Sequence, residues 1–207
     1  INKKYTRCGG NQILDLTIED KHERLKDLIK ERGIVIKDVT LSSNRKSKFY
    51  YDIKSIVCEP EGAALIGELM LAHILKIEPK TMSVGGLESG AIAIATSIVC
   101  SSYLLTPTSR VSGFFVRKNV KTYGLEKMIE GIVKDPVAVV DDVITTGKSV
   151  LDAVAALRNQ GFSNINIVSV IDRETKENLL DQNNLKFHSL FKHSEFAEYI
   201  ESRLVES

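Results

Sequence analysis

Apolar strand-like segments alternate with helix-like segments across the second half of the chain, and this alternation constrains the fold more than any other feature. The segment Val137–Val140 is apolar at every position and precedes a helix expected at about Ser149–Gln160. Strands that are buried on both faces belong to parallel sheets with helices on each side. Three further segments are expected to be strands: Thr81–Val84, Val111–Val116 and Ile165–Ile171. The sequence therefore predicts an α/β fold with a central parallel sheet flanked by helices.

The first third of the chain predicts helices and a pair of strands beside this core. A helix is expected at Asp20–Glu31, because its leucine and isoleucine side chains share one face and Gly33 follows as a C-cap. The stretch Ile34–Asp52 suggests strands. The other helices expected are Pro60–Lys76, Ala91–Ser101 and Glu195–Leu204. At 207 residues, the chain is long enough for one well-buried domain and short for two.

Ligands of parallel sheets bind outside the carboxyl ends of the strands. In this chain, four polar segments follow the predicted strands and should meet at one rim of the sheet. They are Gly85–Gly90, Arg117–Gly124, Asp141–Ser149 and Asp172–Arg173. The sequence therefore predicts a binding site at this rim.

Charge and hydropathy argue against nucleic acid and membrane as partners. Lys plus Arg number 28 and Asp plus Glu number 27, with no long basic block. No apolar run approaches the roughly 18 residues of a membrane helix, and no signal peptide is visible. A cytoplasmic protein is the expectation.

Neither cysteine nor histidine predicts a metal site. Cys8, Cys58 and Cys100 are widely spaced and form no CxxC pair, which suits free thiols in a reducing compartment. The four histidines have no metal-ligand spacing.

The stretch VAVVDDVITTGKSV, Val137–Val150, ends in Gly-Lys-Ser like an ATP-binding P-loop. A P-loop also requires a glycine five residues before Gly147, where the backbone wraps the phosphates. Asp142 occupies that position, and its carboxylate would repel a phosphate. The P-loop interpretation therefore fails.

Asp141 and Asp142 are instead hydrogen-bond acceptors that suit hydroxyl donors, such as the 2′- and 3′-hydroxyls of a ribose. The following residues, Thr145–Ser149, supply hydroxyls and backbone N–H groups at a helix N-terminus, which attracts anions. Together they indicate a pocket for ribose 5-phosphate. The alternative, two N-capping acids ahead of a structural helix, explains the threonines and glycine less well.

This stretch resembles the phosphoribosyl-pyrophosphate (PRPP) signature of type I phosphoribosyltransferases. The resemblance implies the fold of that family, with a small N-terminal hood over the sheet. It also implies that one run binds PRPP: Asp141, Asp142, Val143, Ile144, Thr145, Thr146, Gly147, Lys148 and Ser149. Lys148 replaces a small residue of the family, and it either adds charge to the phosphate site or points to solvent.

A second stretch, FFVRKNVKTYGLEKMIEG, resembles the mobile loop of orotate phosphoribosyltransferases. Composition alone would allow a solvated basic turn at Arg117, Lys118 and Lys121. The resemblance implies that these cations bind the pyrophosphate of PRPP, with Lys121 the best candidate for catalysis. Tyr123 stands where bacterial members often have histidine, and it can still donate a hydrogen bond to phosphate. In the family this loop closes over the neighbouring subunit's site, which implies a homodimer.

Other stretches match the same family. In Thr40–Lys54, Tyr50 and Tyr51 take positions that approach the base, although ordinary strand aromatics are an equal alternative. In VIDRET, Arg173 stands where the family places an arginine facing the orotate carboxylate, and a guanidinium pairs well with a carboxylate. The stretch HSLFKHSEF resembles the C-terminal strand and helix. The implied organisation is a hood segment at 1–54, within the same domain as a PRPP-binding core at 55–207.

The resemblance implies Mg²⁺-dependent transfer of ribose 5-phosphate from PRPP to orotate. Asp141, Asp142 and Lys121 would be catalytic, and Mg²⁺ would be held mainly by substrate oxygens rather than by protein ligands. Thr145, Arg173 and a tyrosine (Tyr50 or Tyr51) would orient the base. One alternative is a transferase for another base, against which Arg173 argues. The other is a PRPP-sensing regulatory protein, against which the net charge of +1 and the cationic loop argue.

Overall fold

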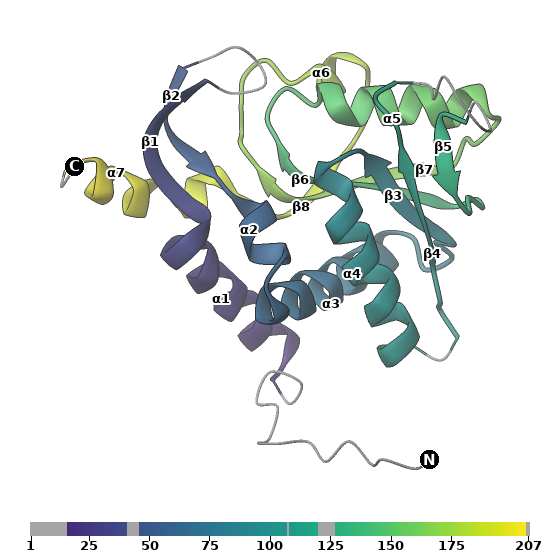
Figure 1. Cartoon of the computed structure of the whole chain (residues 1–207), viewed down its shortest axis with the longest axis horizontal. Coiled ribbons are helices and arrows are strands. Elements are labelled where there is room, and N and C mark those ends of the chain that lie inside the picture. Colours follow the sequence, from purple (N-terminus) through teal and green to yellow (C-terminus); the bar gives the residue numbers. More distant parts are fainter. Residues whose placement is uncertain (1–15, 41–45, 107, 120–126, 206–207) are drawn as a thin grey trace.

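The computed structural model describes residues 16–40, 46–106, 108–119 and 127–205. A six-stranded sheet forms its centre, with the strand order β5-β4-β3-β6-β7-β8 (Figure 1). Neighbouring strands are parallel except β4 and β5, which are antiparallel. The strands are β3 Ser83–Leu87, β4 Ser112–Val116, β5 Ile129–Gly131, β6 Val137–Ile144, β7 Ile165–Asp172 and β8 His188–Lys192. The predicted parallel sheet is confirmed.

Helices cover both faces of this sheet, and β6 supplies side chains to both layers. The helices of the core are α3 Pro60–Ile77, α4 Gly90–Leu105, α5 Lys148–Asn159 and α6 Leu179–Gln182. In Figure 1, α3 and α4 lie below the sheet and α5 lies above it. Ala138 and Val140 pack in the core below, whereas Val137 and Val139 pack in the core above. Successive residues of a strand point to opposite faces, so a fully apolar segment is what a strand between two helical layers requires.

β6 is longer than the sequence predicted. The apolar run ends at Val140, but the strand continues to Ile144 and pairs with β7, with Asp141 opposite Ser169. The prediction that Asp141 begins a loop was wrong, because ladder hydrogen bonds join backbone groups and tolerate polar side chains at the end of a strand. The two acids therefore project from a rigid strand.

The N-terminal segment forms a layer of its own beside the sheet. It comprises α1 Ile18–Leu28, a π-helix at Ile29–Gly33, the antiparallel hairpin of β1 Ile34–Thr40 and β2 Lys46–Tyr51, and α2 Ile53–Val57. The predicted strands in 34–52 are confirmed, and the predicted first helix continues to Gly33 as a π-helix. The expected boundary between 54 and 55 falls inside α2. A buried ion pair joins this layer to the core, with 2.6 Å between Lys21 Nζ and Glu68 Oε1.

The chain ends with β8, a 3-10 helix at His193–Glu195 and α7 Ala197–Val205, which contacts β1. The C-terminal strand and helix are thereby confirmed, and they bring the end of the chain to the N-terminal hairpin (Figure 1). Within the described ranges, no helix is both long and apolar enough to cross a membrane.

Candidate active site

Two adjoining hollows lie at the carboxyl ends of β3, β4, β6 and β7. The larger has a volume of about 810 Å³ and lies along α5, and the smaller, of about 280 Å³, lies toward the N-terminal hairpin. They share six lining residues: Leu87, Lys118, Asp141, Val143, Thr145 and Ser149. Each of the four polar segments expected at the rim contributes lining residues to one hollow or both. We therefore treat the two hollows as one candidate site.

The adjacent acids of β6 face this site in different ways. Asp141 lines both hollows, whereas Asp142 lines only the smaller one and is 9% exposed. The Oδ1 atom of Asp142 accepts the backbone N–H of Val143 at 2.9 Å. Its Oδ2 atom lies 2.6 Å from Nζ of Lys54, which donates a charged hydrogen bond. The carboxylate of Asp142 is thus fixed at both oxygens, and the lysine that fixes it comes from α2.

Burial and the neighbouring charge of Asp142 determine the pKa of Asp141. Burial raises the pKa of Asp141 above its ordinary value, and the charge of Asp142 raises it further. Lys54 and the backbone N–H of Asp142 oppose this rise. For Lys54 itself, burial lowers the pKa, but the hydrogen bond and charge of Asp142 outweigh burial and raise it. Asp141 consequently keeps its proton to a higher pH than an ordinary aspartate, and a protonated carboxyl can both donate and accept hydrogen bonds.

The turn between β6 and α5 presents N–H groups to the larger hollow. Gly147 precedes α5 in the left-handed conformation, with φ of 77°, and no side chain caps the helix. The carbonyl of Thr146 accepts the N–H of Leu179 at 2.9 Å, and the carbonyl of Thr145 accepts the hydroxyl of Thr175. With these carbonyls occupied, the first-turn N–H groups and the dipole of α5 make this turn suitable for an anion.

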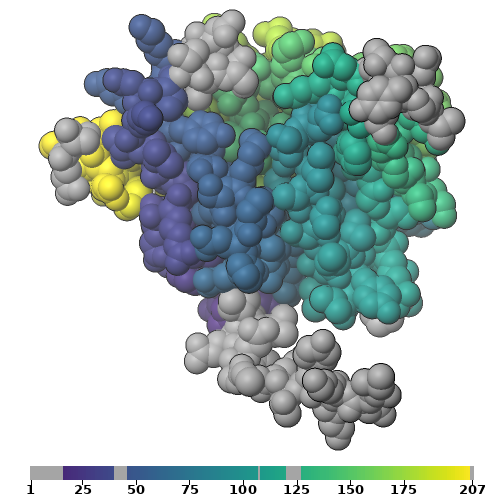
Figure 2. Space-filling view, viewed as in Figure 1, coloured from purple at the N-terminus to yellow at the C-terminus, as the bar shows by residue number. Residues whose placement is uncertain are grey.

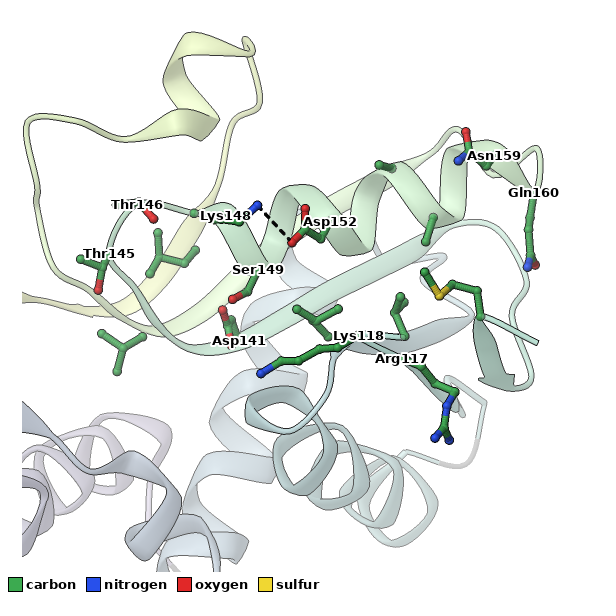
Figure 3. A pocket seen from close by; sticks show the side chains of 18 residues that line it. Arg117, Lys118, Asp141, Thr145, Thr146, Lys148, Ser149, Asp152, Asn159 and Gln160 are labelled. Atoms are coloured by element: carbon green, nitrogen blue, oxygen red, sulfur yellow. Dashed lines mark ion pairs between the residues drawn. The ribbon is translucent and has the colours of Figure 1, made fainter. Parts of the chain in front are cut away.

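Lys148 begins α5 but does not point at the acids. Its side chain is 75% exposed, and Nζ lies 3.7 Å from the carboxylate of Asp152 one turn later (Figure 3). Of the two roles considered for Lys148, the solvent-facing one agrees with this geometry.

The cations that follow β4 point in different directions. In Figure 3, the side chain of Lys118 extends toward Asp141, whereas the guanidinium of Arg117 turns away. Arg117 pairs with Glu130 of β5 at 3.8 Å. The backbone N–H of Lys118 donates to Oε1 of Glu88 at 2.9 Å, which connects this segment to the turn after β3. Lys121 and Tyr123 lie outside the described residues.

Arg173 stands at the end of β7 against the N-terminal hairpin. Its guanidinium carbon lies 4.4 Å from the centre of the Phe49 ring, and Nη2 donates to Oγ of Ser47 at 2.8 Å. Burial lowers the pKa of Arg173, although a guanidinium stays charged in proteins. This arrangement places a half-buried cation at one wall of the smaller hollow.

The two tyrosines singled out from the sequence both line the smaller hollow. Tyr51 is only 1% exposed, and its hydroxyl lies 2.8 Å from Nδ1 of His193. Burial raises the pKa of Tyr51 well above its ordinary value, so the phenol stays protonated. Tyr51 thus belongs to the core as much as to the site.

Two residues of this site were missed by the sequence reasoning, Phe49 and Lys54. Phe49 lies two residues before Tyr51 on β2, and residues two apart share a face of a strand, so the period of the strand could have indicated it. Nothing local indicates Lys54, because its partner Asp142 is 88 residues away.

The described residues contain no group of three or more His, Cys, Asp or Glu side chains placed to hold a metal ion. In proteins, Mg²⁺ commonly keeps several waters and is held by one or two carboxylates together with phosphate oxygens.

Comparison with known proteins relates most of the chain to one family. Residues 52–196 match the phosphoribosyl transferase domain family. The chain is 37% identical over 180 residues to orotate phosphoribosyltransferase of Rhodopseudomonas palustris (strain BisB5), covering 84% of this chain and 94% of that one. It is 38% identical over 182 residues to the Aquifex aeolicus (strain VF5) enzyme of the same name, covering 84% and 97%.

A solved structure has the same arrangement of elements. The crystal structure of Mycobacterium tuberculosis H37Rv orotate phosphoribosyltransferase in complex with PRPP matches with a TM-score of 0.65 and 29% identity, covering 86% of this chain and 99% of that chain. The same enzyme in complex with Fe(III) dicitrate matches with a TM-score of 0.68 and 31% identity, covering 84% and 97%.

Proposed function

We propose a role in catalysis for each group of residues at the rim of the sheet, on the premise that the chain belongs to the phosphoribosyl transferase family and is an orotate phosphoribosyltransferase. The predicted family, fold and activity are thereby confirmed. The enzyme transfers ribose 5-phosphate from PRPP to N1 of orotate, which yields orotidine 5′-phosphate and pyrophosphate for pyrimidine biosynthesis. The bond from C1 of the ribose to pyrophosphate breaks, and a bond from C1 to N1 forms.

The acids of β6 are proposed to hold the ribose. The observation that carries this proposal is the pair itself: a charged Asp142 fixed by Lys54, beside an Asp141 that retains its proton more readily. A ribose diol offers two donors and two acceptors, which a charged and a protonated carboxyl can match between them. Because both acids project from β6, the ribose ring is held against a rigid element while C1 changes partners.

The turn Thr145–Ser149 is proposed to anchor the 5′-phosphate. Support comes from the uncapped N-terminus of α5 and the left-handed Gly147, which aim backbone N–H groups at the larger hollow. Val143 and Ile144 line the same hollow beneath the phosphate. The negative charge of the phosphate would be stabilised by donors that need no reorganisation.

The cationic segment after β4 is proposed to stabilise the charge that grows on pyrophosphate. Lys118 supports this best, because it extends into both hollows toward Asp141. Arg117 would have to leave Glu130 to join it. Lys121, with Tyr123, is proposed as the catalytic loop residue that acts on a neighbouring subunit, in a homodimer that shares its sites. Closing this loop would exclude water from an oxocarbenium-like transition state.

Arg173 is proposed to bind the carboxylate of orotate, with Tyr50, Tyr51 and Thr145 beside the ring. A half-buried guanidinium next to an aromatic hairpin supports the assignment, because a planar fork can pair with a carboxylate through two hydrogen bonds. A purine or uracil offers no such carboxylate. The hood segment 1–54 is therefore proposed to contribute the base side of the site, and the core 55–207 the PRPP side.

Mg²⁺ is proposed as the metal, held chiefly by oxygens of PRPP and by water. The residues present fit such an ion, because the carboxylate of Glu88 lines the smaller hollow and could hold one of its waters. When bound, the ion would neutralise charge on the pyrophosphate. A cytoplasmic location is proposed on the exposed free thiols of Cys58 and Cys100, which suit a reducing compartment.

A base-competition assay tests the substrate assignment. Initial rates with PRPP and Mg²⁺ should be measured with orotate, uracil, adenine and hypoxanthine, in the natural protein and in Arg173→Gln. We expect turnover of orotate alone, and a rise in the KM for orotate in the variant. An unchanged KM for orotate in Arg173→Gln would remove the proposed role of the arginine.

A further inference from the structure

Lys54 joins the N-terminal layer to the strand that bears the two acids. It lies in the first turn of α2, and its ammonium is 2.6 Å from Oδ2 of Asp142. The side chain of Asp142 is 12% exposed and that of Lys54 is 46% exposed, so a half-exposed ammonium covers a nearly buried carboxylate, and both line the smaller hollow. The contact thus connects segments that are 88 residues apart.

The carboxylate of Asp142 depends on this lysine. Its other recorded donor is the neighbouring N–H of Val143, which holds Oδ1 at 2.9 Å. The adjacent Asp141 is a second acid in the same space, and burial together with the charge of Asp142 raises the pKa of Asp141. Without an ammonium at Oδ2, Asp142 would be a buried carboxylate with one backbone donor beside another acid.

We propose that Lys54 is a positioning residue for PRPP: its ammonium fixes the carboxylate of Asp142 in the orientation that faces the ribose. The inference rests on the proposed role of Asp142 in binding the ribose diol. It adds that the N-terminal segment governs binding of PRPP as well as of the base. Each carboxylate oxygen has two acceptor positions, so the carboxylate can receive a ribose hydroxyl while it keeps Lys54.

Other charged groups around the hollow cannot take the place of Lys54 without moving. Arg173 is held by Ser47 and the Phe49 ring, and the backbone of Lys118 is tied to Glu88. Together with Asp141, Glu88 and the phenols of Tyr50 and Tyr51, these are the ionisable groups among the described residues that line the smaller hollow around Lys54 and Asp142. Removal of the Lys54 ammonium therefore leaves Asp142 without an adjacent cation among the described residues.

The test is steady-state kinetics of Lys54→Met, which keeps the length of the side chain and removes its charge, and of Lys54→Arg, which restores the charge. Lys26→Met is the matched control, because Lys26 also pairs across the N-terminal layer, at 3.1 Å from Glu195. We expect Lys54→Met to raise the KM for PRPP about ten-fold, a typical effect of losing one binding interaction. The KM for orotate should change far less, and Lys54→Arg should recover most of the loss.

Selectivity and rescue separate positioning from a general structural effect. A general structural loss should change the KM for PRPP, the KM for orotate and kcat together, whereas loss of positioning should raise chiefly the KM for PRPP. A KM for PRPP in Lys54→Met equal to that of Lys26→Met would overturn the inference, as would a failure of Lys54→Arg to recover the loss.

The double variant Lys54→Met/Asp142→Asn shows whether the lysine acts through the acid. If it does, Lys54→Met should add little in the Asp142→Asn background, and full additivity would mean that Lys54 binds PRPP by itself. If Asp142→Asn alone leaves PRPP binding unchanged, the proposed ribose site fails, which is a separate outcome. Should Lys54→Met not fold, Lys54→Gln in the same assays decides the question.

Discussion

Gly90 begins α4 directly against Asp141. A Cβ atom built on Gly90 would lie 2.9 Å from Oδ1 of Asp141 and 3.1 Å from Oδ1 of Asp142. A real Cβ atom essentially never lies within 3.0 Å of another residue's atom, so a side chain at Gly90 would force the carboxyl of Asp141 to move and would crowd that of Asp142.

This relationship predicts that Gly90→Ala displaces the carboxyls without unfolding the protein. Gly113→Ala is the control, because its Cβ would be 3.2 Å from a methyl of Val99, a similar crowding with no acid nearby. We expect Gly90→Ala to raise the KM for PRPP at least several-fold. Gly113→Ala should leave the KM for PRPP unchanged, and an equal rise in this KM in the two variants would contradict the prediction.

Gly147→Ala should destabilise the fold and weaken PRPP binding. Its φ of 77° is unfavourable for alanine, and a Cβ would lie 2.6 Å from Cγ of Leu180. Gly161 has φ of 89° and open space around it, so Gly161→Ala isolates the backbone strain. From urea denaturation we expect a loss of about 1–3 kcal/mol in Gly147→Ala, and a smaller loss in Gly161→Ala. Equal losses would show that the contact with Leu180 costs nothing.

Phe49→Leu should weaken the orotate side of the site. The ring lies 4.4 Å from the guanidinium carbon of Arg173, and its loss removes about 0.5–2 kcal/mol of cation–π attraction. We expect the KM for orotate to rise several-fold with the KM for PRPP little changed. Tyr103→Leu removes a similar pair, with Arg110 at 4.5 Å on an exposed part of α4, and should leave both constants unchanged.

The raised pKa of Asp141 predicts how stability depends on pH. Between the ordinary aspartate pKa of 3.8 and the raised value, the folded protein binds a proton that the unfolded chain releases, so rising pH lowers the free energy of unfolding. Asp141→Asn removes this loss, and should therefore be more stable than the natural protein near neutral pH, with the difference vanishing near pH 4. Denaturant titrations from pH 4 to 8 measure it.

The control for that series is Asp27→Asn, whose side chain is 57% exposed on α1. Its stability difference from the natural protein should stay small over the whole range. If the stability difference between Asp141→Asn and the natural protein does not grow with pH, the raised pKa of Asp141 is contradicted.

Lys148→Ala should leave PRPP binding nearly intact. Nζ of Lys148 pairs with Asp152 on an exposed face of α5, and exposed pairs contribute little. We expect the KM for PRPP to change by less than about two-fold. A ten-fold rise would instead assign Lys148 to the phosphate site.

The sequence by itself determined the layered sheet, the apolar strand segment that leads to the two acids, and the family. The apolar segment Val137–Val140 indicates a strand between two helical layers, because burial on two faces requires apolar residues at consecutive positions. The helical segments around it are indicated by their local periodicity. The turn after β6 could also be predicted from the sequence, because Gly147 and the threonines determine the backbone conformation within a few residues.

Only the tertiary structure decided which side chains complete the site. The pairing of Lys54 with Asp142 and the stacking of Arg173 on Phe49 join residues 88 and 124 apart, brought together by the packing of α2 and the hairpin against the sheet. Likewise, adjacent cations such as Arg117 and Lys118 are equivalent in sequence, but in the segment after β4 their side chains point in different directions. One meets Glu130 and the other extends toward Asp141, because direction depends on the neighbouring elements rather than on residue type.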